Sequence, residues 1–371
     1  MAKFLFYDDM LINILLEEEK PSGGAAVQTY AWMIGLIETG HDVSALTNMT
    51  GKEKIKQECE NLRLIPLYDP DKGIKYIRWI YYRIPYLYKK LRSSKPDYLV
   101  QGIPDWSTLF LGIMCKFLRI KLILRVSSDH LIDKRFYQFS TKTKKLMMTL
   151  GFSLSSIIIC QNSYQYKIIR NKYKSKIIAE FGNPFYYKPV IKISQYGERK
   201  YIAWVGLFQF QKNLKLLYEI AYKLKNEEFR IAGDILPAGI DEETREYLDK
   251  LKTLKNVQFV GYINKSEVMG FLTYAKYLLC TSRYEGFSNT FLESMACGTP
   301  ILTTEKANPN NIISNFNLGY VYKDTQELYE NYSHFSSGLY SVMSENSLDY
   351  VKSKHNYRTL SHELLKLLEI T

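Results

Sequence analysis

Short apolar runs alternate with amphipathic helical segments along almost the whole chain, and this alternation limits the fold more than any other feature of the sequence. In residues 27–37, for example, the apolar positions recur at intervals of three and four, as on one face of a helix. Strands that alternate with helices are joined by crossovers, which place the strands in a parallel sheet covered by helices. The sequence therefore predicts an α/β fold.

The same alternation starts again after a segment with Gly, Asn and Pro between residues 181 and 197. A chain of 371 residues also exceeds the usual size of one domain, about 100–200 residues. We therefore predict two α/β domains with a cleft between them, at 1–187 and 188–350. Residues 351–371 are predicted to form a C-terminal helix that packs back toward the first domain.

The expected strands are the apolar runs bounded by Gly, Asn, Asp or Pro. They are Lys3–Tyr7, His41–Thr47, Tyr98–Val100, Leu122–Val126, Ile157–Cys160, Tyr201–Val205, Phe229–Ala232, Val257–Val260, Tyr277–Cys280 and Ile301–Thr303. Helices are expected near residues 27–37, 213–225, 265–275 and 289–297.

The positive charge lies in the first half of the chain. The formal net charge is +12, and residues 1–190 hold 29 Lys and Arg against 17 Asp and Glu, whereas residues 191–371 hold 21 of each. The first domain is therefore expected to face an anionic partner. Nucleic acid is one candidate, but the sequence lacks the motifs of nucleic-acid-binding modules, so we expect no such partner. A phospholipid surface fits the charge at least as well.

The cysteines and the apolar segments bear on localisation. The five cysteines are scattered without C-x-x-C spacing, which argues against a disulfide framework and a zinc site and favours a reducing compartment. No window approaches the 18 apolar residues of a transmembrane helix, and the first residues lack the apolar core of a secretory signal. The expected location is the cytoplasm, with a peripheral position on the inner face of the plasma membrane as an option.

The segment 282–300 carries the most informative pattern: a strand end, a Gly-containing loop, a short helix and a Gly-Thr-Pro turn. Backbone N–H groups of residues 288–290 would lie at the start of this helix, where unpaired donors and the helix dipole favour phosphate. Glu285 and Glu293 flank the helix start, and carboxylates accept hydrogen bonds from sugar hydroxyls. A surface loop with a dipole-stabilised Glu is the alternative interpretation.

The spacing of Glu285 and Glu293 resembles the E-x7-E motif of the family 4 retaining nucleotide-sugar glycosyltransferases, within their pattern Glu-Gly-Phe…Glu-x-Met-Ala-Cys-Gly-Thr-Pro. Further segments are similar to this family in the same order along the chain: Ser22–Gly24, Gly40–Val43, Trp204–Leu207 with Lys212 and Asn213, Ile231–Asp234 and Val257–Gly261. The resemblance implies the GT-B fold, in which two Rossmann-like domains have parallel sheets that face each other across a cleft.

The resemblance also implies roles for individual residues. It implies that Glu285 binds hydroxyls of the donor sugar, that Glu293 binds the ribose, and that Lys212 is the cation on the diphosphate. Together with Glu285 and Lys212, His130 and Asp129 form the implied catalytic set; they follow a strand of the first domain. The implied donor-binding residues are Gly23, Gly24, Gly206, Asp234, Tyr262, Ile263, Phe287, Ser288, Asn289, Thr290 and Glu293.

Gly24 and Leu207 lie at two informative positions of this resemblance. Glycine at position 24 has a direct physical reason, because backbone must approach phosphate closely and glycine also permits positive φ. Leu207 departs from the family, which usually has Arg directly after the glycine. Another basic residue is expected to replace that Arg, or phosphate binding is weaker.

The sequence predicts no metal and no cofactor. Asp69-Pro-Asp71 fits the D-x-D pattern by which the other glycosyltransferase fold binds manganese, but Asp-Pro-Asp-Lys-Gly is also ordinary turn chemistry. The chain lacks a G-x-G-x-x-G segment after a strand, which disfavours a dinucleotide-dependent oxidoreductase.

The segment 74–92 combines an apolar helical face with a basic one. Its apolar residues are Ile77, Ile80, Ile84, Leu87, Tyr88 and Leu91, and its basic residues are Lys75, Arg78, Arg83, Lys89, Lys90 and Arg92. We expect the apolar face to pack on the sheet. The basic and aromatic rim could contact a membrane surface.

Together these patterns predict a retaining hexosyltransferase. It would move a sugar from a nucleotide diphosphate donor, most simply a UDP-sugar, to a saccharide or lipid-linked saccharide acceptor in surface polysaccharide biosynthesis, as in a capsule or lipopolysaccharide. Two alternatives remain: a nucleotide-sugar epimerase of the same fold, and a non-catalytic subunit that docks another transferase to the membrane.

Overall fold

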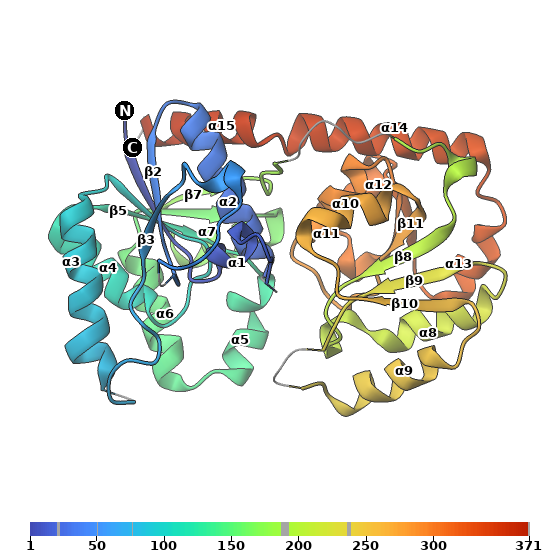
Figure 1. The fold of residues 1–371 in the computed structure, drawn as a ribbon, viewed down its shortest axis with the longest axis horizontal. Helices are drawn as coiled ribbons and strands as arrows, with labels where there is room; N and C mark the ends of the chain where they lie inside the picture. Colours follow the sequence, from blue (N-terminus) through green and yellow to red (C-terminus); the bar gives the residue numbers. More distant parts are fainter. Residues whose placement is uncertain (21–22, 50, 76, 187–192, 236–238, 370–371) are drawn as a thin grey trace. The chain divides into compact units, whose positions relative to one another are not determined.

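The computed structural model describes residues 1–20, 23–49, 51–75, 77–186, 193–235 and 239–369. The chain divides into two compact units (Figure 1). Unit 1 comprises Met1–Tyr186 together with Asn356–Thr371, and unit 2 comprises Tyr187–His355. The divisions fall after residues 186 and 355, where the sequence predicts 187 and 350. Each unit contains one parallel sheet.

The described residues of unit 1 form a seven-stranded parallel sheet in the order β3-β2-β1-β4-β5-β6-β7. The strands are β1 (Lys3–Tyr7), β2 (Asp42–Thr47), β3 (Arg63–Pro66), β4 (Tyr98–Gln101), β5 (Lys121–Arg125), β6 (Ile157–Cys160) and β7 (Ile177–Glu180). The strand order reverses between β1 and β4. In open α/β sheets, ligands bind beyond the carboxyl ends of the strands at such a reversal.

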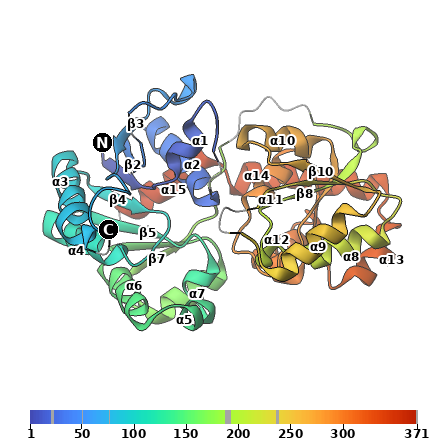
Figure 2. The ribbon, with the colours of Figure 1, turned by 60° about the horizontal axis from the view of Figure 1, so that its bottom comes forward.

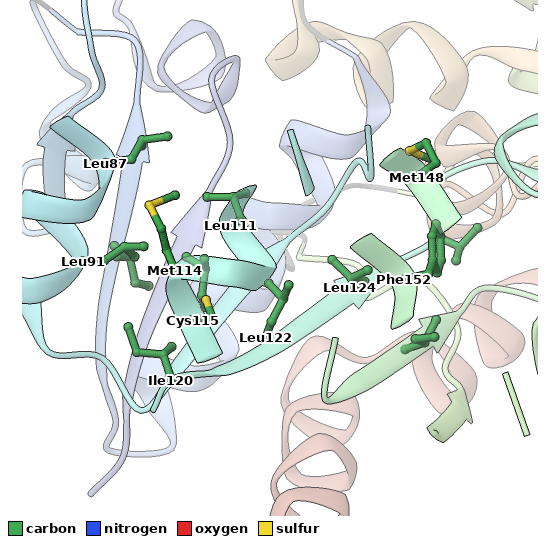
Figure 3. Packing of buried hydrophobic residues seen from close by; sticks show 14 of the residues in the cluster. Leu87, Leu91, Leu111, Met114, Cys115, Ile120, Leu122, Leu124, Met148 and Phe152 are labelled. Atoms are coloured by element: carbon green, nitrogen blue, oxygen red, sulfur yellow. The ribbon is translucent and has the colours of Figure 1, made fainter. Parts of the chain in front are cut away.

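Helices cover both faces of this sheet. The helices are α1 (Leu11–Leu15), α2 (Gly24–Glu38), α3 (Ile84–Ser94), α4 (Thr108–Leu118), α5 (Lys134–Phe139), α6 (Lys142–Leu154), α7 (Ser163–Lys172) and α15 (Tyr357–Glu369). One core lies between the sheet and α3, α4 and α6; Figure 3 shows Leu87, Met114 and Leu122 within it. The second core lies on the opposite face, under α2 and α15.

Helix α15 belongs to unit 1 because it packs closely on α2 (Figure 2). Gly35 of α2 is the point of contact: a Cβ atom at this position would lie 2.1 Å from Oγ of Ser361. At the end of α2, the carboxylate of Glu38 accepts hydrogen bonds from the hydroxyl of Tyr357 at 3.0 Å and pairs with Arg358 at 2.5 Å. The last helix is thus fixed by close packing and by a carboxylate clamp.

The described residues of unit 2 form a six-stranded parallel sheet in the order β10-β9-β8-β11-β12-β13. The strands are β8 (Tyr201–Val205), β9 (Phe229–Ala232), β10 (Val257–Gly261), β11 (Ala275–Leu279), β12 (Ile301–Thr304) and β13 (Gly319–Tyr322). The helices are α8 (Leu214–Lys223), α9 (Glu242–Lys252), α10 (Lys265–Thr273), α11 (Asn289–Ala296), α12 (Ile312–Asn315), α13 (Thr325–Tyr332) and α14 (Ser337–Lys354). Helices α8, α9 and α13 cover one face, and α10 and α11 the other (Figure 1). Within the described ranges, no helix has the length and apolar character needed to span a bilayer.

The segment 74–92 differs from its predicted single apolar face. Leu87 and Leu91 are buried as expected, but Ile77 and Ile80 are 49% and 73% exposed. The reason is a π-helical turn, Trp79–Arg83, which precedes α3 and carries a wider hydrogen-bonding ring than an α-helix. This turn changes the rotation of the chain, so that Trp79 packs on the core and the two isoleucines face outward.

Candidate functional site

Two lysine–carboxylate pairs lie beyond the carboxyl ends of the strands of unit 2. The Nζ atom of Lys212 is 3.1 Å from Oε2 of Glu285, and Lys265 forms an ion pair with Glu293. Lys212 ends a 3₁₀ turn after β8, and Glu285 lies in the loop between β11 and α11. Lys265 opens α10, and Glu293 is in α11. Glu293 is buried and Glu285 is largely buried, with 3% and 13% of their side chains exposed.

The loops that carry Lys212 and Glu285 are joined by hydrogen bonds. The hydroxyl of Thr281 donates to the carbonyl oxygen of Lys212 at 2.7 Å and accepts from the indole N–H of Trp204 at 3.0 Å. The side-chain amide of Gln211 donates to the carbonyl oxygen of Tyr284 at 3.0 Å and lies 3.5 Å from Oε2 of Glu285. These bonds fix the lysine and the carboxylate in one local arrangement.

The electrostatic balance keeps Lys212 charged. Burial alone would lower the pKa of its ammonium group, but the nearby carboxylate of Glu285 outweighs this effect, so the pKa of Lys212 is raised. A buried ammonium group that stays charged is suited to bind an anion, provided that the anion can take the place of Glu285.

The predicted glycines after β8 and β9 leave room for the lysine and for close backbone contact. A Cβ atom at Gly206 would lie 3.4 Å from Cε of Lys212, so glycine lets the lysine stem lie over the backbone. A Cβ atom at Gly233 would lie 2.1 Å from the carbonyl oxygen of Gly206. Asp234 follows and accepts a hydrogen bond from the backbone N–H of Ile235 at 2.7 Å.

The start of α11 is a second feature suited to anions. Ser288 precedes the helix, but its hydroxyl does not cap it and instead bonds the hydroxyl of Thr290 at 2.6 Å. The first turn carries no acidic residue. The positive end of the helix dipole is therefore not offset by an acidic side chain in the first turn, which favours an anion at this helix start.

The structure places the implied donor-binding residues of unit 2 at the carboxyl ends of four neighbouring strands. Gly206 follows β8, Asp234 follows β9, and Tyr262 and Ile263 follow β10. Beyond β11 come Phe287, Ser288, Asn289 and Thr290, and then Glu293. The side chain of Tyr262 is 40% exposed, whereas Phe287 contacts the ring of His355, with 4.9 Å between the ring centroids.

The remaining predicted site residues belong to unit 1. Asp129 accepts hydrogen bonds from the amide groups of Asn162 at 3.1 Å and Gln165 at 2.8 Å, and Nδ1 of His130 lies 2.7 Å from the hydroxyl of Ser128. Burial raises the pKa of Asp129 despite these two hydrogen bonds. Burial, assisted by the charge of Arg135, lowers the pKa of His130.

The glycine pair before α2 has a different conformation from the one that the sequence analysis allowed. Gly23 caps α2 with a φ of −77°, and Gly24 is its first helical residue, so positive φ is not the reason for glycine here. A Cβ atom at Gly23 would meet nothing within 4 Å, so close packing is not the reason for glycine there either. Ser22 of the same motif lies outside the described residues.

The D-x-D pattern forms a turn. The carboxylate of Asp69 accepts a hydrogen bond from the backbone N–H of Asp71 at 2.9 Å, which is an Asx turn, and both residues are exposed. Across the described ranges, no group of three or more His, Cys, Asp or Glu residues has the arrangement of a metal site.

The sequence analysis missed three residues that shape the site: Lys265, Gln211 and Thr281. Lys265 lies directly after Tyr262–Asn264. Its position just beyond a predicted strand could have indicated that it belongs to the site. Thr281 follows the strand predicted at Tyr277–Cys280. Gln211 had no signal, because its bond to Tyr284 joins segments 73 residues apart in the chain.

Comparisons with known proteins show a family match in unit 2 and a shared fold. Residues 191–335 match the family described as glycosyl transferases group 1. An uncharacterized glycosyltransferase of Methanocaldococcus jannaschii, MJ1607, is 24% identical over 312 residues, which cover 76% of each protein. The structure resembles sucrose-phosphate synthase from Thermosynechococcus elongatus (TM-score 0.74, 14% identity, 100% and 98% of the two chains). It also resembles Anabaena HepE in complex with UDP and glucose (TM-score 0.76, 13% identity, 100% of each chain).

Proposed function

Because residues 191–335 match the family of glycosyl transferases group 1 and the chain has the GT-B fold, we propose that the protein is a retaining, metal-independent hexosyltransferase. Its donor is a UDP-sugar, and its acceptor is a saccharide or a lipid-linked saccharide of a surface polysaccharide. The observation that carries the proposal is the buried pair of Lys212 and Glu285 beside the start of α11. The complex of HepE with UDP and glucose supports the choice of donor.

The chemistry follows from the charges at this site. As the bond between the anomeric carbon and the diphosphate breaks, negative charge grows on the leaving oxygen. Lys212 and the start of α11 stabilise this charge, and Glu285 accepts hydrogen bonds from hydroxyls of the sugar. An oxygen of the departing diphosphate takes the proton of the acceptor hydroxyl, and the acceptor oxygen bonds the anomeric carbon from the same face.

Release of UDP from a panel of UDP-sugars, with and without saccharide acceptors, tests the proposal. We expect acceptor-dependent release that persists in EDTA, and a product with the anomeric configuration of the donor. Absence of both turnover and donor binding across the panel would overturn it. Conversion of the donor sugar without acceptor would show an epimerase instead, and donor binding without turnover in a stable complex with another transferase would show a partner subunit.

Glu293→Gln is expected to weaken the binding of UDP by about 1–3 kcal/mol, or roughly 5- to 150-fold in Kd. The carboxylate is almost fully buried next to Lys265, and its replacement removes a charged hydrogen-bond acceptor for the ribose. Titration calorimetry with UDP measures the change.

Glu246→Gln is the matched control for that variant. Glu246 also pairs with a lysine, Lys250, but both side chains are about half exposed on α9. An exposed ion pair of this kind contributes little to the stability of the protein. UDP should therefore bind the control as it binds the unmodified protein. Equal affinity of UDP for Glu293→Gln and for the control would show that Glu293 does not contact the nucleotide.

We further propose that unit 1 binds anionic membranes through the segment 74–92. Its first part exposes Ile74, Ile77, Ile80 and Tyr81, with exposed fractions of 49–73%. The basic residues Lys75, Arg78, Lys89, Lys90 and Arg92 lie in the same segment. Apolar side chains among basic ones suit the interface of an anionic bilayer.

Reversing Arg78, Lys89 and Arg92 to Glu is expected to release the protein from vesicles that contain anionic lipid, since each basic residue near the surface contributes about 1 kcal/mol. Sedimentation with neutral and anionic vesicles at several salt concentrations measures this, and binding of the unmodified protein should fall steeply with salt. The control reverses three exposed lysines of unit 2, Lys225, Lys252 and Lys255. Unchanged sedimentation of the first variant would rule the segment out as the membrane site.

A further inference from the structure

Arg125, at the end of β5, is a buried cation with no partner in the part of the chain that the structure describes. Its residue is 3% exposed, and neither Nη1 nor Nη2 has a hydrogen-bond partner. Burial lowers the pKa of Arg125 to about 10, so the guanidinium is still charged at neutral pH. A buried charge without hydrogen bonds is unfavourable, and proteins keep one rarely unless a ligand completes it.

Asp8 is the candidate counter-ion of Arg125 within unit 1, but both of its carboxylate oxygens accept hydrogen bonds from other groups. One oxygen of Asp8 accepts a hydrogen bond from the hydroxyl of Thr29 at 2.6 Å, and the other accepts one from the backbone N–H of Met10 at 3.1 Å. Burial raises the pKa of Asp8, and the charge of Arg125 lowers it by less. The two side chains form no ion pair among the described residues. The N–H groups of Nη1 and Nη2 therefore need another acceptor.

Gly102, just beyond β4, borders the guanidinium of Arg125. A Cβ atom at Gly102, just beyond β4, would lie 3.6 Å from Nη2 of Arg125 and 3.5 Å from Oγ1 of Thr29, with no third atom within 4 Å. Glycine thus keeps the end of β4 free of a side chain beside the guanidinium and α2. This position lies at the carboxyl ends of the strands, beside the reversal of strand order.

A second unsatisfied polar atom lies on the next strand end. The register pairs Arg125 with Ile159 of β6, and Gln161 follows two residues later. Ile123 and Ile159 belong to the core under α2, so by strand alternation Arg125 and Gln161 share that side of the sheet. Gln161 is 5% exposed, and its Oε1 atom has no partner among the described residues.

We propose that these strand ends of unit 1 form a subsite for an oxyanion on the acceptor, either the carboxylate of an acidic sugar or the phosphate ester of a sugar phosphate. Two N–H groups of Arg125 would hold two oxygens of the anion, and Gln161 would accept a hydrogen bond from a neighbouring hydroxyl. A guanidinium offers its donors as a planar fork that matches both anions, and the charge favours an anion over a neutral hydroxyl. Binding of an oxyanion at Arg125 does not depend on the proposed function, whereas the identity of that oxyanion as part of the acceptor does.

The subsite is tested by ligand binding in the absence of turnover. A negative result would then overturn the subsite without bearing on whether the protein is a transferase. The probes are D-glucuronate, glucose 1-phosphate and glucose, measured by ligand-observed NMR on the full chain. We expect one or both anions to bind at least tenfold more tightly than glucose, and the two anions separate a carboxylate subsite from a phosphate subsite. Arg125→Met should lose at least tenfold in affinity for the preferred anion, and Arg125→Lys several-fold, because lysine keeps the charge but not the fork.

UDP binding and thermal unfolding serve as controls. UDP should bind both variants as it binds the unmodified protein, because its proposed residues lie in unit 2. Arg125→Met should keep or raise the Tm, since it removes an unpaired buried charge. Should the methionine variant fail to fold, Arg125→Lys decides. Equal binding of glucose and the two anions, or unchanged anion binding by a folded variant, would overturn the proposal.

Discussion

Replacing Lys212 with methionine is expected to lower turnover by ~10²–10³-fold while it changes the affinity for the UDP-sugar much less. Lys212 is the cation proposed to face the departing diphosphate, and the charge that it meets grows toward the transition state. Methionine is unbranched like the stem of lysine and lacks the ammonium group with its charge and its N–H donors. Steady-state UDP release gives kcat and KM, and titration with UDP gives the affinity.

Loss of folding must be separated from loss of chemistry in this variant. Removing one partner of a buried pair leaves Glu285 as an unpaired charge, which costs about 3–5 kcal/mol of stability. The double variant Lys212→Met with Glu285→Gln removes both charges, so it should regain most of this stability without regaining turnover. A folded Lys212→Met protein with a kcat within threefold of the original would show that Lys212 does not act on the leaving group.

The sequence predicted the central strands well because a strand buried on both faces is a continuous apolar run. β1, β6, β8 and β9 have the expected bounds. The strands β3, β7 and β13 were not predicted, and they lie at the edges of the sheets. An edge strand pairs on one side only and needs fewer apolar residues: β3 reads Arg-Leu-Ile-Pro, with a proline that a central strand would exclude.

The site was only partly predictable, for a different physical reason. Motifs placed Lys212 and Glu285 in separate loops, but their contact spans 73 residues of sequence and depends on β8 and β11 lying side by side. The pairing of Lys265 with Glu293 depends likewise on α10 packing against α11. Periodicity reports which face of an element is buried, and it contains no information on which two loops meet. Arg125 could not be singled out because a charged residue at a strand end is usually solvated.

Gly233→Ala is expected to destabilise unit 2 by about 1–3 kcal/mol and to weaken UDP binding at least tenfold. The added Cβ atom would lie 2.1 Å from the carbonyl oxygen of Gly206, so the backbone must move. That backbone is held by hydrogen bonds from Gly206 N–H to the carbonyl oxygen of Ala232 at 3.0 Å and from Phe208 N–H to that of Asp234 at 3.0 Å. A shift there displaces the loop that leads to Lys212.

Gly270→Ala provides the matched control for this variant in the same unit. Gly270 lies inside α10, where a Cβ atom would meet nothing within 4 Å, so alanine should be neutral or should stabilise the helix by up to about 1 kcal/mol. Thermal unfolding followed by circular dichroism should show a Tm lower by several degrees for Gly233→Ala and unchanged or higher for Gly270→Ala. If Gly233→Ala has the same Tm and the same affinity for UDP as the control, the two strand ends can separate without a cost in stability. The close approach of their backbones would then not be what positions Lys212.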